Sequence, residues 1–216
     1  MDLKTIVTGN ISSVNLIEGT SEWMWGTDYT YGDLYEAEEL YEYGSRIVSN
    51  RLILVNRSSA EVFEPLTRKD GQYFGKPVFQ DGKIMILAAD FSERKVRIIS
   101  LDPQSGVLKT EAEIPRSSFQ NCYNLSLQRK PLMLTRIDSE SFDVIWPVQK
   151  SFPVKGNETF CFLKDGSMYF SRWFEDPDYR EETFIRDFET GETLEVIRAC
   201  LCRNDDGQWW MLKENE

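Results

Sequence analysis

The amino-acid sequence predicts an all-β protein, built as a propeller-like array of about five four-stranded blades. A short apolar run, a tight turn and a stronger apolar run recur along the chain, with turns near Arg51, Gly82, Lys130, Gly166 and Gly207. These turns are about 39 residues apart on average, a spacing typical of propeller blades and solenoid repeats. A second, more polar pair of alternating segments comes after two of the turns, so each repeat is predicted to contain four strands.

The turn chemistry supports the hairpins directly. Asp-Gly separates apolar runs in VFQDGKIMIL from Val78, in CFLKDGSMYFS from Cys161 and in CRNDDGQWWML from Cys202. Two-residue turns that match the twist of paired strands need positive φ, which Gly adopts freely and Asp adopts better than most residues. IVSNRLILV from Ile47 is a further copy of the same pattern, and NLSLQRKPLMLT from Asn124 is a weaker one.

The outer strand pairs are predicted in the segments after the hairpins. KVRIISLDPQSGVLKTEAEI from Lys95 and TFIRDFETGETLEVIRA from Thr183 each contain two alternating segments, joined by a turn that ends at Gly106 or Gly191. Alternation with period two is the pattern of a half-buried strand. Less regular outer pairs are predicted in AEVFEPLTRKDGQYF and FDVIWPVQKSFPV.

The N-terminal segment is predicted to close the array. The last hairpin ends near Lys213 and has no further chain for its outer strands, whereas VNLIEG and EWMWGTDYTY offer short apolar segments near the N-terminus. A closed ring removes exposed sheet edges. We therefore expect one domain over 1–216, in which 1–44 completes the last blade and 45–213 carries the hairpin repeats. An open array of the same units and two β-sandwiches are the alternatives.

One short helix is predicted over residues 33–43. Asp33 followed by Glu36 resembles a capping box, and Gly44 stands where a helix C-cap would. Apolar residues recur at helical spacing, at Leu34, Ala37, Leu40 and Tyr41. The alternative is a strand with Tyr35, Ala37, Tyr41 and Tyr43 on one face.

Two pairs of tryptophans are expected to serve the fold. Trp23 and Trp25 alternate around Met24, so in a strand both indoles lie on one face, inside a stack of sheets. Trp209 and Trp210 are adjacent and face opposite sides of a strand. One of the two is therefore predicted in the core and the other between blades or at the surface.

Charge restricts the class of partner. With 36 acidic and 25 basic residues the formal net charge is -11. Nucleic-acid binding depends on clustered Lys and Arg, so no nucleic-acid partner is expected, and a basic protein fits better. The N-terminus has no apolar run like that of a signal peptide, and no segment approaches the length of a membrane span. A cytoplasmic protein without a membrane partner is expected.

The cysteines and the absence of histidine restrict the chemistry. The chain contains no His, which excludes zinc sites built on imidazole and nucleophiles activated by His. The four cysteines, Cys122, Cys161, Cys200 and Cys202, are too few and too scattered for a disulfide scaffold, and we expect free thiols that pack in the interior. No metal site and no cofactor is predicted, and no catalytic residue can be assigned.

The best candidate for a binding surface is the segment RWFEDPDYREE, predicted as a long acidic hairpin tip between two apolar strands. Its rings are candidate anchors, because aromatic side chains carry much of the energy at interface cores. A calcium loop is the weaker alternative, since the segment lacks the Gly and the ligand density of known Ca²⁺ loops. The predicted partner-binding residues are Trp173, Glu175, Asp176, Asp178, Tyr179, Glu181 and Glu182.

Three functional classes are compatible with these features. The first, which we favour, is a non-enzymatic binding protein with an acidic surface, such as an inhibitor or immunity-type protein for a basic partner. The second is a carboxylate-dependent, glycoside hydrolase-like enzyme, because that chemistry needs two carboxyl groups and is often accompanied by aromatic platforms. The third is a scaffold for a small ligand that the sequence does not identify.

Overall fold

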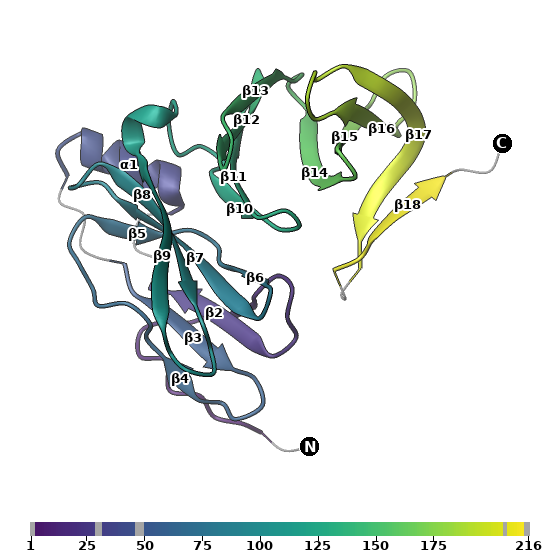
Figure 1. Ribbon diagram of the computed structural model, residues 1–216. Coiled ribbons are helices and arrows are strands. Elements are labelled where there is room, and N and C mark those ends of the chain that lie inside the picture. Colours follow the sequence, from purple (N-terminus) through teal and green to yellow (C-terminus); the bar gives the residue numbers. More distant parts are fainter. Residues whose placement is uncertain (1–2, 29–31, 46–49, 205–206, 214–216) are drawn as a thin grey trace. The chain divides into compact units, whose positions relative to one another are not determined.

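The computed structural model describes residues 3–28, 32–45, 50–204 and 207–213 (Figure 1). Half of these residues lie in strands and 6% in helices. The strands form four small antiparallel sheets, each a meander of the kind that makes a propeller blade. The predicted fold class is therefore confirmed, with four sheets where about five were expected.

The chain divides into two compact units, residues 1–127 and 128–216. The first unit holds the first two sheets, and the second holds the fourth sheet and nearly all of the third. The assignment of residues 1–216 to a single domain stays a prediction.

The first sheet brings the N-terminal strands against a strand that lies after the helix. Its order is β1-β2-β3-β4, and β2 pairs with β3 from Trp23 opposite Asn56 to Thr27 opposite Leu52. Trp23 and Trp25 are partly buried against the core, as expected. The strands are β1 (Asn15–Leu16), β2 (Trp23–Thr27), β3 (Leu52–Asn56) and β4 (Val62–Phe63).

This pairing corrects one prediction. The expectation that residues 1–44 complete the last blade differs from the structure, because β1 and β2 belong to the first sheet and β18 (Trp209–Lys213) pairs with β17 (Thr193–Arg203). The first strand of the hairpin predicted near Arg51 falls on residues 46–49, which lie outside the described residues, and the described strand β3 pairs with β2 and β4. Burial explains why β2 pairs with β3. Leu52 and Leu54 of β3 belong to an apolar cluster, and Trp23 and Trp25 of β2 pack against the same cluster.

The second sheet contains the hairpin predicted at Gly82. Asp81 and Gly82 both have positive φ, 50° and 78°, as this kind of two-residue turn requires. Ile84 and Ile86 of the central strand are fully buried and join the cluster of the first sheet. The strands are β5 (Gln72–Phe74), β6 (Val78–Gln80), β7 (Lys83–Asp90), β8 (Lys95–Leu101) and β9 (Leu108–Pro115), with β6 paired to one end of β7.

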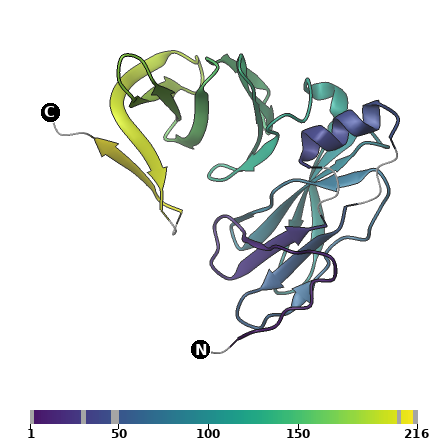
Figure 2. The same ribbon diagram turned by 180° about the vertical axis from the view of Figure 1, so that it is seen from behind.

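The helix predicted over residues 33–43 is confirmed as α1 (Leu34–Glu42), which lies beside β5 (Figures 1 and 2). The Asp33 carboxylate accepts hydrogen bonds from the amides of Tyr35 (2.8 Å) and Glu36 (3.0 Å). The Glu36 carboxylate accepts one from the Asp33 amide (2.9 Å), which completes the capping box. After Glu42 the backbone reaches Gly44 with φ 76°, so the helix ends where the sequence predicts.

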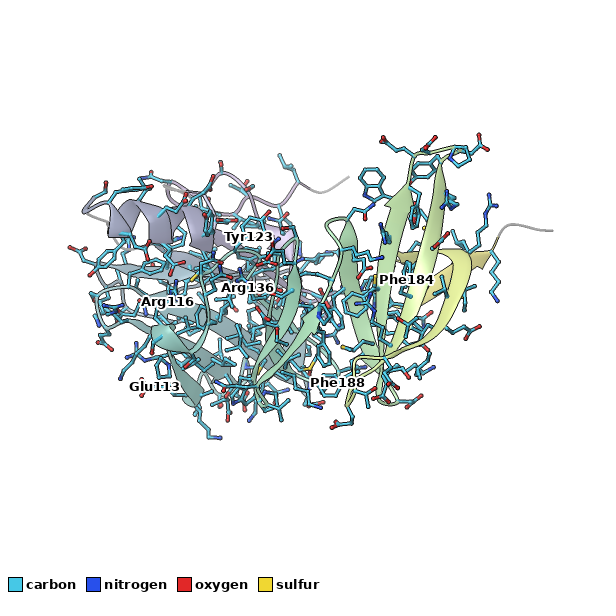
Figure 3. The ribbon with its side chains drawn as sticks, turned by 90° about the horizontal axis from the view of Figure 1, so that it is seen from above. Glu113, Arg116, Tyr123, Arg136, Phe184 and Phe188 are labelled. Atoms are coloured by element: carbon cyan, nitrogen blue, oxygen red, sulfur yellow. The ribbon has the colours of Figure 1, made fainter. Side chains whose placement is uncertain are left out.

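A buried carboxylate anchors α1 to the loop that comes after β9 and the short 3₁₀ helix Arg116–Ser118. Glu38 is 4% exposed and accepts hydrogen bonds from the Arg116 guanidinium and, at 2.7 Å, from the Cys122 amide. The Tyr35 and Tyr123 rings meet edge to face with their centroids 5.3 Å apart. Figure 3 labels Arg116 and Tyr123, which both belong to the segment after β9. The charge of Arg116 is thus neutralised by a residue far away in the sequence.

The third sheet has the predicted pattern. A hairpin with Lys130 at φ 51° joins its first two strands, and the outer pair comes from FDVIWPVQKSFPV as expected. Arg136 is buried between the carboxylates of Asp138 (2.7 Å) and Asp143 (2.9 Å). The strands are β10 (Ser126–Gln128), β11 (Met133–Ile137), β12 (Ser141–Trp146) and β13 (Lys150–Pro153).

Aromatic side chains form the core of the second unit. Phe142 of β12 stacks on Phe160 at 4.3 Å between centroids and meets Phe170 edge to face at 5.4 Å. Phe142 and Phe170 are 1% and 0% exposed, respectively. Aromatic pairs of this kind stabilise a core beyond the area that they bury. The third and fourth sheets are therefore packed face to face through these rings.

The last predicted hairpin belongs to the fourth sheet and does not begin a fifth, which is why four sheets are found where about five were predicted. The first half of its long strand β17 pairs with β16, and the second half pairs with β18. Trp210 is 53% exposed, as predicted for one of the two, whereas Trp209 is only partly buried and packs on Phe162 at 5.2 Å between ring centroids, so neither indole lies in the core. The remaining strands are β14 (Glu158–Lys164), β15 (Ser167–Phe174) and β16 (Arg180–Asp187).

Candidate functional site

The predicted acidic tip is the turn between β15 and β16. Glu175, Asp176 and Asp178 have exposed side chains there. The two predicted anchors, Trp173 and Tyr179, are 44% and 65% exposed. Large exposed rings flanking exposed carboxylates form a surface that is suited to a protein partner.

Arginines brace the tip, which the sequence analysis did not anticipate. The Arg180 guanidinium lies 4.2 Å from the centroid of the Phe174 ring and that of Arg172 lies 4.6 Å from it. Arg180 also donates to the backbone carbonyl of Asp176 at 3.1 Å. The cation–π contacts and this hydrogen bond connect Phe174 and the backbone at Asp176 through the Arg180 side chain.

Two of the predicted tip acids have internal partners instead of facing solvent freely. Glu182 accepts a hydrogen bond from Arg180 at 3.0 Å, and Glu181 accepts one from the Tyr179 hydroxyl at 2.7 Å. Glu182 is also the cross-strand neighbour of Arg172 and Arg198. These two acids therefore hold the base of the tip, and the other three present their charge at its end.

A cavity of about 190 Å³ lies at the base of the tip, where β16, β17 and β18 meet. Its cationic lining comes from Arg180, Arg198 and Lys213. The other polar lining comes from Tyr179 and Glu181, and the apolar lining from Ala199, Cys200 and Leu212. The cavity thus has three cationic groups and one carboxylate within a strongly acidic chain.

The Cys200 thiol, which lines the cavity, is weakly acidic. The hydrogen bond to the Glu181 carboxylate raises the pKa of Cys200 to about 11, with burial as a further cause. Burial raises the pKa of Cys161 to about 12 and raises that of Cys122 also. All four cysteines are free, but only Cys122 is fully buried, so the expectation of interior packing holds for that residue alone. Thiols with such pKa values are poor nucleophiles at neutral pH.

Replacing Glu181 by Gln is expected to speed alkylation of Cys200 by iodoacetamide at pH 8. Loss of the neighbouring negative charge lowers the pKa of the thiol, and the larger thiolate fraction outweighs the lower intrinsic nucleophilicity, giving an increase of up to about tenfold. The rate is measured under native conditions by mass spectrometry of the Cys200 peptide.

Glu182→Gln is the matched control for this measurement, because Glu182 carries the same charge but binds Arg180. An equal acceleration in both variants would contradict a direct effect of Glu181. Modification of the buried Cys122 should stay unchanged in both.

The described residues contain no group of three or more His, Cys, Asp or Glu side chains arranged to hold a metal ion. Among these residues there is also no helix with the length and apolar character needed to cross a membrane. The weaker calcium alternative would use Asp176 and Asp178 with Glu181 or Glu182. Asp176 and Asp178 are exposed, whereas Glu181 and Glu182 accept hydrogen bonds from Tyr179 and Arg180. The candidate site thus consists of the exposed rings and acids of the tip and the cavity at its base.

No protein-family model matches this chain, and no curated protein does so. Among solved structures it is similar to dipeptidyl peptidase 4 of Porphyromonas gingivalis, with 11% identity over 86% of this chain and 31% of that chain and a TM-score of 0.43. A chain from a structural and mechanistic study of two prolyl endopeptidases has 11% identity over 89% and 29% and a TM-score of 0.49. A bifunctional GH43-CE protein of Bacteroides eggerthii has 10% identity over 92% and 30% and a TM-score of 0.42.

The chain spans about three tenths of the length of each of these three proteins. At 10 to 11% identity, their activities do not carry over to this chain. Its function is therefore argued from its own residues.

Sequence reasoning located the tip but missed the cavity. Arg180 stands within the tip segment, next to a run of acids that dominates its composition. Arg198 and Lys213 come from β17 and β18, and no local pattern connects them with the tip. The bend of β17 from one partner strand to the next brings them together.

Proposed function

We infer that this protein is a non-enzymatic binding protein that docks a basic protein partner on the tip between β15 and β16. The observation that carries the proposal is the pair of exposed rings, Trp173 and Tyr179, beside the exposed acids Glu175, Asp176 and Asp178. An inhibitor or immunity-type role for a basic partner belongs to this proposal, as does a cytoplasmic location.

The rings supply the apolar part of such an interface. A Trp or Tyr that a partner covers contributes strongly to affinity, and large aromatic side chains are enriched where binding energy is concentrated. Arg172 and Arg180 stack on Phe174 directly beneath the tip, so the rings are offered from an ordered hairpin. A preformed surface loses less conformational entropy on binding than a flexible loop.

The exposed acids supply the long-range electrostatic attraction to the partner. Exposed charges contribute little to monomer stability but steer the encounter with an oppositely charged partner. The net charge of -11 works in the same direction for a basic partner. Charge should thus affect mainly the association rate, and the rings mainly the lifetime of the complex.

Replacing Glu175, Asp176 and Asp178 by Gln, Asn and Asn is expected to slow association with the partner by about tenfold at low salt. The effect should shrink as ionic strength rises, because screening weakens attraction between exposed charges. The midpoint of thermal unfolding should stay within about 2 °C, since surface substitutions of this kind change stability little. Glu181 and Glu182 are left intact because both have internal partners.

A matched control removes three charges from the other end of β16. Glu189, Glu192 and Glu195 are exposed around the turn from β16 to β17, and changing all three to Gln gives the same net charge. Pull-downs from the source cell at low ionic strength are compared for the parent, the tip variant and this control, and association rates are then measured with the captured protein. A basic protein that all three capture at equal rates contradicts docking at the tip.

The glycoside hydrolase alternative stays a prediction. That chemistry needs two carboxyl groups on either side of the scissile bond. The cavity at the base of the tip has one carboxylate in its lining, Glu181, and its oxygen already accepts a hydrogen bond from Tyr179. The binding role is therefore the proposal that the geometry favours.

A further inference from the structure

The outer edge of the fourth sheet lacks the protection that the other three sheets have at theirs. Sheet edges are usually protected by charged side chains, Pro, bulges or short strands. Strand β4 is two residues long, β9 reads LKTEAEIP and β13 reads KSFP, so the latter two combine charge with Pro. Strand β18 reads WWMLK, with four large apolar residues before one charge. This edge is therefore suited to pairing with another strand.

Strand β18 presents both its backbone and apolar side chains. It lies at the end of its sheet beside β17, and the five-residue pairing between them runs without a bulge (Figure 1). Trp210 and Leu212, two residues apart, lie on one face of the strand and are 53% and 52% exposed. Large apolar side chains that are exposed next to each other mark an interaction surface.

Charge favours a second copy of this chain at β18 over a basic protein. The paired segments Ala199–Arg203 and Trp209–Lys213 contain two basic residues and no acid, within a chain of net charge -11. Two such chains repel each other overall, so contact between them costs least where the paired strands contribute no carboxylates. A basic partner would find no attraction from these two segments.

The sequence of β18 is also complementary to itself. When two copies pair antiparallel about a two-fold axis at Met211, Trp210 of each copy lies opposite Leu212 of the other. Trp209 then lies opposite Lys213, which brings an ammonium group beside an indole. Pairs of both kinds are favourable across antiparallel strands. A two-fold interface uses the same surface on both copies, as this register does.

We propose that two copies of this chain form a dimer by antiparallel pairing of their β18 edges about Met211, so that the fourth sheet continues from one copy into the other. Main-chain hydrogen bonds supply affinity, and the Trp210–Leu212 pairs set the register. A five-residue edge buries less than a standard interface, so the dissociation constant is expected on the order of 10–100 μM. The dimer goes beyond the proposed function, which uses the tip.

Sedimentation equilibrium of the purified chain measures the association, with a reductant present to prevent disulfides between copies. The mass should rise from 25.2 kDa towards twice that value between about 5 and 500 μM. Hydrogen exchange of residues 209–213 should slow over the same range. Trp210→Lys and Leu212→Glu should each weaken association by at least about tenfold, because each places a charge opposite an apolar side chain.

Mixing the two variants tests the register. In a dimer of one Trp210→Lys chain and one Leu212→Glu chain, the two new charges have opposite signs and lie opposite each other, while the second Trp210–Leu212 pair is intact. An equimolar mixture should therefore associate at least about fivefold more tightly than either variant alone. Recovery of this kind cannot come from a folding defect in either chain.

Trp173→Lys and Leu194→Glu are the matched controls, since these side chains are 44% and 58% exposed and belong to other strands of the same sheet. Both should associate like the parent. Trp210 and Leu212 are about half exposed, so the unfolding midpoints of their variants should stay within about 2 °C of the parent at low concentration.

A mass of 25.2 kDa at every concentration would overturn the proposal and leave the edge to another chain. Association that both β18 variants retain would also overturn it, as would a mixture that associates no better than its components. Loss of association in Trp173→Lys alone would assign the contact to the tip. The basic partner takes no part in these measurements, so their failure leaves docking at the tip intact, and failure of docking leaves the dimer intact.

Discussion

Replacing Phe170 by Ala is expected to lower the free energy of unfolding of the second unit by about 3–5 kcal/mol, the usual cost of truncating a fully buried Phe. Phe170 is 0% exposed and lies between Phe142 and Phe160, with ring centroids at 5.4 and 5.6 Å. The Arg186 guanidinium lies 4.9 Å from its centroid. The substitution therefore opens a cavity and also removes the ring that Arg186 faces.

The loss of the Phe170 ring should also weaken a neighbouring ion pair. Arg186 donates to the buried Glu158 carboxylate at 2.8 Å, and a guanidinium that loses its aromatic neighbour is held less firmly against that carboxylate. Hydrogen exchange of β14, β15 and β16 should accelerate together, which reports on this unit even when the two units unfold separately. Urea unfolding gives the free energy.

Tyr179→Ala is the control for this prediction, since it removes a similar ring from the surface of the same sheet, where Tyr179 is 65% exposed. Stability should change by no more than about 0.5 kcal/mol. An equally small change for Phe170→Ala would show that the aromatic cluster is loosely packed and would contradict the close stacking of its rings.

Replacing Glu38 by Ala is expected to cost about 2–3 kcal/mol in the first unit, because it removes a buried carboxylate from the partly buried Arg116 guanidinium and from the Cys122 amide. The Arg116 guanidinium keeps the carbonyls of Phe119 (2.7 Å) and Gln120 (2.8 Å) and the Phe119 ring, and the Cys122 amide loses its acceptor. Helix α1 should then separate from the loop after β9, seen as faster hydrogen exchange across residues 34–42.

A double-mutant cycle tests the cause. If Arg116→Met in the Glu38→Ala background recovers a large part of the lost stability, the cost came from the unpaired charge. Glu42→Ala on the same helix is the control, because that residue is exposed and its loss should change stability by no more than about 0.5 kcal/mol. No recovery in the double variant would show that packing of the Glu38 side chain, not its charge, is the main contribution.

The candidate site was only partly accessible to sequence reasoning. The acids and rings between Trp173 and Glu182 stand next to one another in the chain, so they could be identified as a hairpin tip. The role of each acid could not be predicted, because Glu175 is exposed while Glu181 binds Tyr179 and Cys200. Cys200 belongs to another strand, and its distance from the tip depends on how β17 bends.

By itself the sequence determined the local elements: the hairpins at Gly82 and Gly166, the capping box of Asp33 and Glu36, and the meander of the outer strands. These result from φ preferences, side-chain hydrogen bonds and alternation, which act within a few residues. Tertiary structure alone decided that β2 pairs with β3 across the helix, that β18 extends the fourth sheet, and that Arg180, Arg198 and Lys213 line one cavity. Those choices depend on which apolar faces can be buried together and on the register between distant strands, and a local pattern contains neither.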